Sequence, residues 1–223
     1  MQILAELHPK ANREKLLREL DVMSSFDGYD IPDSPLGLPS VLPSTVAVLI
    51  RERLGEGKRL IVNQRLYDVN ELFVYSLSYS AKAFNFEIAY TKGDKPKVGR
   101  EIGYLSSEEG VNISKSLGVR AGMMLSLRKS REEVMARLES NADFFLGLYF
   151  SGVDALKGLK RNVIPYLIVM TEKNKDFLSS LTQPTFKEED VPSVLSSLES
   201  YVDAVLLSSP GDLDFFRRFS RKA

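Results

Sequence analysis

The sequence predicts an α/β protein that folds as a single (β/α)8 (TIM) barrel over residues 1–223. Eight short apolar segments alternate with segments of helical periodicity along the whole chain, which is the pattern of such a barrel. One of these segments, residues 163–170, is almost continuously apolar, as expected of a parallel strand buried on both faces. The competing architecture is a doubly wound open sheet, but no segment carries its Gly-x-Gly-x-x-Gly turn.

The first half of the chain supplies four of the expected strands. Asn12 is expected to cap the first helix, because its side chain can accept from the backbone of the first turn. A proline-rich loop, residues 31–43, precedes a second helix that Ser44 is expected to cap, and Asp68 is expected to cap a third. We place the strands at residues 2–7, 22–29, 59–63 and 86–91, and the second and third helices at residues 45–54 and 69–84.

The second half continues the alternation. Ser106 with Glu109, and Ser130 with Glu133, have the spacing of capping boxes, which mark the starts of two helices. These helices should end near residues 118 and 140. We place the remaining strands at residues 121–127, 142–150, 163–170 and 203–208, and the remaining helices at residues 152–160, 173–181, 188–201 and 211–219.

Composition excludes several classes of function. Thirty basic residues balance thirty acidic ones, so no overall field recruits nucleic acid or an anionic membrane. The chain has no cysteine and one histidine, His8, which excludes disulfides, thiolate chemistry and a multi-histidine zinc site. No apolar run reaches the roughly 18 residues that span a bilayer, and the N-terminus lacks the pattern of a signal peptide. We therefore expect a cytoplasmic protein without a metal, nucleic-acid or membrane partner.

Polar residues follow most of the expected strands. The carboxyl ends of barrel strands meet at one rim, where barrel enzymes hold their active sites. We therefore expect a site at this rim. Its candidate side chains are Glu6, His8, Asp27, Tyr29, Asn63, Gln64, Arg65, Lys92, Asp94, Arg128, Tyr149, Thr171, Glu172 and Ser208.

Glu6 is an acid inside an otherwise apolar first strand. Burial would raise its pKa and make it a general acid near neutral pH. The alternative is a salt bridge to Lys92 or Arg65 that closes the barrel mouth. Asp94 also has two interpretations, because the Gly-Asp pair after the strand at residues 86–91 suits either a ligand contact or an ordinary turn.

The other candidates would bind parts of a substrate. Arg65 and Lys92 suit an anionic substituent. Four aromatic residues would either stack on a planar ring or pack in the core: Tyr90, Phe145, Tyr149 and Phe150.

Three short motifs resemble those of the methylenetetrahydrofolate reductase family. The segment Tyr90-Thr91-Lys92-Gly93-Asp94-Lys95-Pro96 resembles that family's strand ending Arg-Gly-Asp-x-Pro. Glu6-Leu7-His8-Pro9-Lys10 is similar to its Glu-Phe-x-Pro-Pro-Lys, and Ala142-Asp143-Phe144 matches its Ala-Asp-Phe. The resemblance implies a barrel that binds a flavin, usually FAD, and passes a hydride to the methylene group of a reduced folate or pterin.

The resemblance also implies roles for individual residues. Glu6 takes the place of the acid that protonates the pterin, and Asp94 that of the carboxylate beside the flavin and the pterin. Lys92 stands where the family has a cation near the flavin, and Arg137 stands near a lysine that holds the cofactor. We further expect Asn63 beside the cofactor, with Arg65 and Tyr149 at the substrate.

The chain also departs from the family pattern. Gly147-Leu148 replaces a Thr-Gln pair whose amide meets the pterin, and residues 126–129 replace a tyrosine and a histidine that touch the flavin. FMN, a modified pterin, or contacts supplied by a partner subunit or by a second copy of the chain would each reconcile these departures. The alternative function is a barrel without flavin that binds a pterin or assists methyl transfer.

Overall fold

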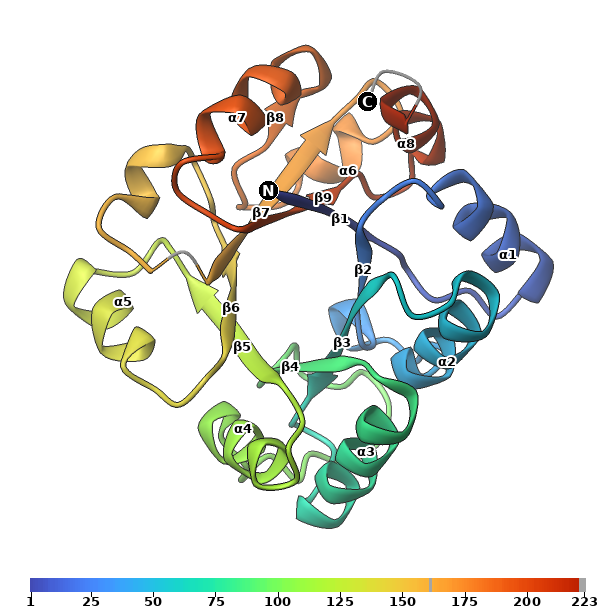
Figure 1. Ribbon diagram of the computed structural model, residues 1–223, viewed down its shortest axis with the longest axis vertical. Coiled ribbons are helices and arrows are strands. Elements are labelled where there is room, and N and C mark those ends of the chain that lie inside the picture. The colour runs from blue at the N-terminus through green and yellow to red at the C-terminus, as the bar shows by residue number, and fades with distance from the viewer. Residues whose placement is uncertain (161, 221–223) are drawn as a thin grey trace.

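The computed structural model describes residues 1–160 and 162–220, and it is a closed barrel of parallel strands surrounded by helices (Figure 1). The eight barrel strands are β1 Gln2–Glu6, β2 Gly28–Ile31, β3 Arg59–Arg65, β4 Glu87–Thr91, β5 Ala121–Ser126, β6 Phe144–Leu148, β7 Val163–Met170 and β9 Ala204–Ser208. Each pairs with its neighbour in chain order, and β9 pairs with β1 to close the barrel. The predicted (β/α)8 fold is confirmed. A two-residue strand that the sequence did not predict, β8 Phe186–Lys187, pairs in parallel with the last two residues of β7.

Eight α-helices and three short 3₁₀ helices occur among the described residues. The α-helices are α1 Arg13–Val22, α2 Pro43–Leu54, α3 Glu71–Phe84, α4 Ser107–Ser116, α5 Arg131–Leu138, α6 Lys175–Ser179, α7 Val191–Leu198 and α8 Leu213–Ser220. The 3₁₀ helices are η1 Pro35–Gly37, η2 Val153–Leu156 and η3 Glu188–Asp190. None of the helices in the described part of the chain is long and apolar enough to cross a membrane.

The helix caps show where local sequence decided the structure. Asn12 accepts from the backbone of Lys15, and both predicted capping boxes are formed. The Ser44 cap is wrong, because α2 begins two residues earlier than predicted, with Pro43 in its first turn, where a missing N–H costs nothing. The Asp68 cap is also wrong, because Asn70 caps α3 and Asp68 pairs with Arg65 instead.

The second strand is displaced from its predicted position. Residues up to Val22 belong to α1, and β2 begins only at Gly28, after a turn. Gly28 is required there, because a Cβ atom would lie 2.1 Å from the carbonyl oxygen of Arg59 on β3. The strand ends at Ile31, two residues later than predicted. This later end changes which side chain of β2 reaches the barrel mouth.

Alternate residues of each strand pack into two separate hydrophobic layers. The inner cluster fills the barrel and includes Leu4, Ile61 and Phe144, whereas the outer cluster lies between the strands and the helices. Tyr90 belongs to the outer cluster, and its hydroxyl hydrogen-bonds to Ser114 of α4 at 2.7 Å. Phe145 and Phe150 lie in the same layer. Of the four aromatic candidates for stacking, these three are therefore core residues.

Candidate active site at the carboxyl ends of the strands

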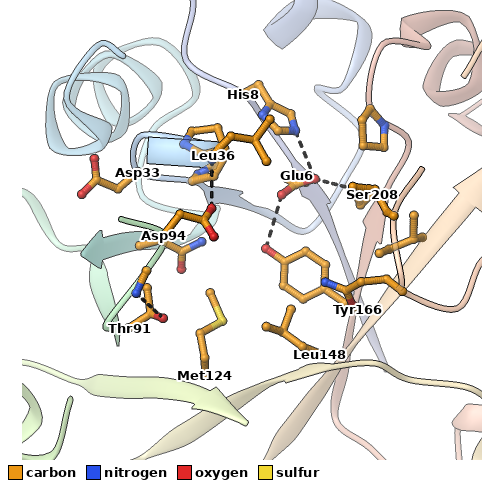
Figure 2. A pocket seen from close by; sticks show the side chains of 18 of the residues that line it. Glu6, His8, Asp33, Leu36, Thr91, Asp94, Met124, Leu148, Tyr166 and Ser208 are labelled. Atoms are coloured by element: carbon orange, nitrogen blue, oxygen red, sulfur yellow. Dashed lines mark hydrogen bonds and ion pairs between the residues drawn. The ribbon is translucent and has the colours of Figure 1, made fainter. Parts of the chain in front are cut away.

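A cavity of about 370 Å³ lies at the carboxyl ends of the strands, where the sequence predicts a site (Figure 2). One side of it is apolar, and the other is polar and mostly charged. The apolar side consists of Met124, Leu148, Ile168, Phe177, Leu178 and Leu181. The polar side includes Glu6, His8, Asn63, Arg65, Asp94, Tyr166 and Ser208.

Glu6 is the last residue of β1, and its side chain is 10% exposed. The Ser208 hydroxyl donates to Oε2, and His8 Nε2 lies 3.2 Å from the same oxygen. The Tyr166 hydroxyl lies 3.4 Å from Oε1. Burial alone would raise the pKa of Glu6, but its His8, Ser208 and Tyr166 partners outweigh burial and hold the pKa below its ordinary value. The expected rise in pKa is wrong, and the ion pair of Glu6 is with His8, not with Lys92 or Arg65.

Asp30 is a site residue that the sequence interpretation missed. It lies on β2 with no exposed surface, and its Oδ2 accepts from the Tyr166 hydroxyl at 2.7 Å and from Asn63 Nδ2 at 2.9 Å. Burial, with the nearby Glu6 carboxylate, raises the pKa of Asp30 to about 7. Asp30 therefore has the perturbed pKa that was expected of Glu6.

Asp27 and Tyr29, the residues of this segment that the sequence placed at the site, do not line the cavity. Asp27 accepts from the backbone of Ile3 at the opposite end of the barrel, and Tyr29 donates outward to the carbonyl of Met23. Successive strand residues point to opposite faces, so an outward Tyr29 requires an inward Asp30. The proline at position 32, which ends the strand, is the signal that could have corrected the register.

Asp94 lines the cavity and also joins two loops. Its Oδ2 accepts from the backbone N–H of Leu36 at 3.0 Å, and Lys97 N donates to Gly37 O at 2.8 Å nearby. The loop after β4 is thereby fastened to the loop after β2, as Figure 2 shows for Asp94 and Leu36. The turn interpretation and the cavity interpretation of Asp94 are compatible, because one of its oxygens holds the loop and the carboxylate still faces the cavity.

Arg65 and Asn63 reach the cavity from β3, and most of their polar atoms are already engaged. The Arg65 guanidinium donates to Asp68 at 3.0 Å and to the carbonyl of Ser34 at 3.3 Å. Asn63 holds Asp30, while its Oδ1 and the Nε of Arg65 are buried without a protein partner. Unpaired polar atoms at a cavity wall are typical of functional sites.

Several predicted residues do not line the cavity, and three of them had been expected to contact the cofactor or the substrate. Lys92 donates to the carbonyl of Gly103 and lies over the ring of Tyr67. Arg137 of α5 pairs with Glu108 and lines a separate hollow beside α5. Tyr149 lies under the guanidinium of Arg128, whose Cζ is 4.0 Å from the ring centroid. The candidate side chains that share one cavity are Glu6, His8, Asn63, Arg65, Asp94 and Ser208.

Neither a metal centre in the described residues nor a sequence match identifies the chemistry of the site. Within residues 1–160 and 162–220, no group of three or more His, Asp or Glu side chains is arranged to hold a metal ion. No family model and no curated protein sequence gives a significant match to this chain.

Several solved structures share the fold at low sequence identity. An oxaloacetate acetylhydrolase superposes with a TM-score of 0.57 at 16% identity, over 100% of this chain and 80% of that one. N-(5'-phosphoribosyl)anthranilate isomerase from Pyrococcus furiosus gives 0.56 at 14% identity, over 100% and 98%. A mutant tryptophan synthase alpha-subunit from the same organism gives 0.63 at 12% identity, over 99% and 95%. At these identities the likeness shows a shared barrel fold and nothing of the reaction.

Proposed function

We propose that this barrel is an enzyme of the methylenetetrahydrofolate reductase type, which reduces the methylene group of a reduced folate or pterin to a methyl group. The motif resemblance supports the proposal, and so does the meeting of Glu6 and Asp94 at one cavity. The solved barrels of similar fold are enzymes with other activities, so the proposal rests on the site.

The hydrogen-bonding capacity of the cavity wall is the observation that carries the proposal. The cations at the wall are paired with carboxylates, Arg65 with Asp68 and His8 with Glu6, and in the guanidinium of Arg65 only the buried Nε lacks a protein partner. Asp94 accepts one N–H and keeps acceptor capacity for a ligand. Such a wall favours a ring edge rich in N–H donors over a phosphate. The aminopyrimidine edge of a pterin offers two adjacent N–H donors.

The shape of the cavity suits the same ligand. A flat bicyclic ring would lie against the apolar side formed by Met124 and Leu148. The volume of about 370 Å³ is near the lower limit of ligand pockets, about 300–1,000 Å³, and suits one such ring system better than a stacked pair.

The residues present do not fit a bound FAD in this cavity. FAD carries a diphosphate and a ring edge with two carbonyl oxygens, which require cations and hydrogen-bond donors. Of the residues expected to contact it, Lys92 and Arg137 have their charged groups bound to Gly103 and Glu108, away from the cavity. We therefore derive no step through a flavin, and FAD or FMN binding stays a prediction for the absorbance measurement described below.

The protein's own part in the reaction is proton delivery and orientation. As the bond between the methylene carbon and one ring nitrogen breaks, that nitrogen takes a proton, and a hydride from a two-electron donor adds to the carbon. Glu6 faces the cavity and supplies the proton, because Ser208 and His8 fix its carboxylate toward the ligand. The apolar side excludes water from the reacting carbon.

Calorimetric titration with a reduced pterin, together with a turnover assay, tests the proposal. We expect one molecule bound per chain, and Glu6→Gln should retain binding but lose about 10²–10⁴-fold in turnover. An absorbance spectrum of the purified protein, with a band near about 450 nm if a flavin is bound, decides the cofactor. Absence of both pterin binding and turnover would overturn the proposal.

The second candidate is a barrel that binds a pterin, or assists its methyl transfer, without a redox centre. The outward positions of Lys92 and Arg137 favour it. Pterin binding without reduction, with either flavin or nicotinamide as the donor, would support this candidate, and a partner subunit would then be sought.

A further inference from the structure

Four side chains form a continuous row across the barrel mouth. Asp30 Oδ2 accepts from the Tyr166 hydroxyl at 2.7 Å, and that hydroxyl lies 3.4 Å from Glu6 Oε1. The other oxygen of Glu6 lies 3.2 Å from His8 Nε2. Figure 2 shows Tyr166, Glu6 and His8 following one another along one side of the cavity. The row thus leads from a fully buried carboxyl group to an imidazole near the surface.

The outer end of this row opens onto a second cavity. Glu6 and His8 line the ligand cavity and also a separate cavity of about 420 Å³. The second cavity lies between α1 and α8, and its other lining side chains are mostly charged, with Lys10, Arg18 and Lys173 among them. The His8 side chain is 29% exposed. His8 can therefore exchange protons with solvent while a ligand fills the first cavity.

Glu6 must be supplied with a proton before it can act as an acid. Because its partners hold the pKa of Glu6 low, Glu6 is a carboxylate at neutral pH. Burial lowers the pKa of His8, but the Glu6 carboxylate raises it more, so His8 keeps its proton to a higher pH than a free imidazole does. The pKa of Asp30 is about 7, so Asp30 is also partly protonated. A Glu6 that acts as an acid must receive its proton from one of these neighbours.

We propose that Asp30, Tyr166, Glu6 and His8 form a proton relay, in which Asp30 stores a proton and His8 reloads the row from the second cavity. Asp30 passes its proton to the Tyr166 oxygen while Tyr166 passes its own to Glu6 Oε1, so the tyrosine ends neutral. Glu6 then protonates the ligand. His8 then gives a proton to Glu6, Glu6 passes it back through the Tyr166 hydroxyl to Asp30, and His8 recovers a proton from water.

The groups that face this row come from five strands and one loop. The row itself takes Glu6 from β1, Asp30 from β2 and Tyr166 from β7. Asn63 on β3 contacts Asp30, and Ser208 on β9 contacts Glu6. Lys10 lies in the loop with His8 and lowers its pKa slightly against the effect of Glu6. Asn63 and Ser208 do not titrate, so the pH response belongs to Asp30, Glu6 and His8.

The sole histidine makes this relay measurable without any substrate. In an NMR titration of the full chain, the His8 imidazole should titrate above its ordinary pKa and show a second inflection near pH 7, from Asp30. Asp30→Asn should remove the second inflection and the infrared band of a neutral carboxyl group. Glu6→Gln should lower the His8 pKa and should also move the loss of that band to a lower pH, because the Glu6 charge helps to raise the pKa of Asp30. Asp94→Asn, a carboxylate outside the row, should leave the His8 titration unchanged.

The use of the relay in turnover rests on the proposed function, and it is measured by kcat and KM. Tyr166→Phe keeps the cavity shape but disconnects Asp30, so kcat should fall about 10²-fold at constant KM. In His8→Gln, kcat should fall by a similar factor, and added imidazole should restore activity. A His8 titration that is the same in wild type and Asp30→Asn would overturn the relay. An intact His8–Asp30 coupling without pterin turnover would overturn the proposed function alone.

Discussion

At the scale of single residues, the surroundings of two carboxyl groups decide which of them holds a proton. Glu6 and Asp30 are close enough to share Tyr166, but Glu6 has a cation beside it and Asp30 has none among its contacts within the described residues. The like charge of Glu6 adds to burial at Asp30. Two carboxyl groups with pKa values driven apart are typical of acid–base sites.

The first prediction concerns the pH dependence of stability. The unfolded chain releases the Asp30 proton near pH 3.8 and the folded protein near pH 7, so the folded state binds more protons between these values. Stability from this group is therefore present at low pH and lost as pH rises toward 7. At about 1.36 kcal/mol per pH unit, the wild type should lose about 3 kcal/mol relative to Asp30→Asn between pH 5 and pH 8. Urea unfolding of both proteins at these two pH values measures the difference. Parallel pH profiles would contradict the assignment.

The second prediction concerns the glycine before Asp94. Gly93 has a φ of +80°, and a Cβ atom there would lie 2.7 Å from Cγ of Arg65. Gly93→Ala should cost about 1–2 kcal/mol for the backbone conformation and more for displacing Arg65 from Asp68. Gly99→Ala is the matched control, because Gly99 also has a positive φ but its Cβ would meet nothing within 4 Å. Equal losses of unfolding free energy in the two variants would show that the contact with Arg65 is unimportant.

At the scale of elements, helix starts are the part of the fold that local chemistry fixes most directly. In the capping box of α4, Ser106 accepts from the backbone of Glu109, and the Glu109 side chain accepts in return from the backbone of Ser106. Ser106→Ala should therefore destabilise the protein by about 1 kcal/mol in urea unfolding. Ser80→Ala, inside α3, should be neutral or slightly stabilising, because alanine is the better helix former there. A Ser80→Ala loss as large as that of Ser106→Ala would refute the capping explanation.

The strands show why the fold was easier to predict than the site. The bounds of β7 follow from its continuous apolar run and were predicted to the residue. The bounds of β2 were not, because residues 22–29 are apolar enough to suit a strand while belonging to the end of α1 and a turn. The end of β2 lies two residues later than predicted. This error leaves the barrel unchanged, but it kept Asp30 out of the predicted site. His8 is a local partner of Glu6, but its other two partners, Tyr166 and Ser208, lie more than 150 positions away in the sequence, and no local pattern predicts them.

At the scale of the whole molecule, closure of the barrel brings the site together. Residues of β1 and β9 pair directly, although they are 202 positions apart at Glu6 and Ser208. The cavity takes side chains from strands all around the barrel and from the loops after β2 and β4. A ligand in this cavity therefore contacts most of the fold at once, and its binding energy should stabilise the barrel as a unit.

The last prediction follows from this arrangement. A reduced pterin that binds only the folded protein should stabilise it by about 2.7 kcal/mol at a concentration one hundred times its Kd. For a chain of this length that corresponds to a rise in Tm of about 5–10 °C. Inorganic phosphate at the same concentration should produce no comparable rise, because the cations at the cavity wall are engaged by Asp68 and Glu6. Calorimetric scans with each ligand measure both shifts. A larger rise with phosphate would mean that the cavity is built for an anion, and would remove the main support for a pterin.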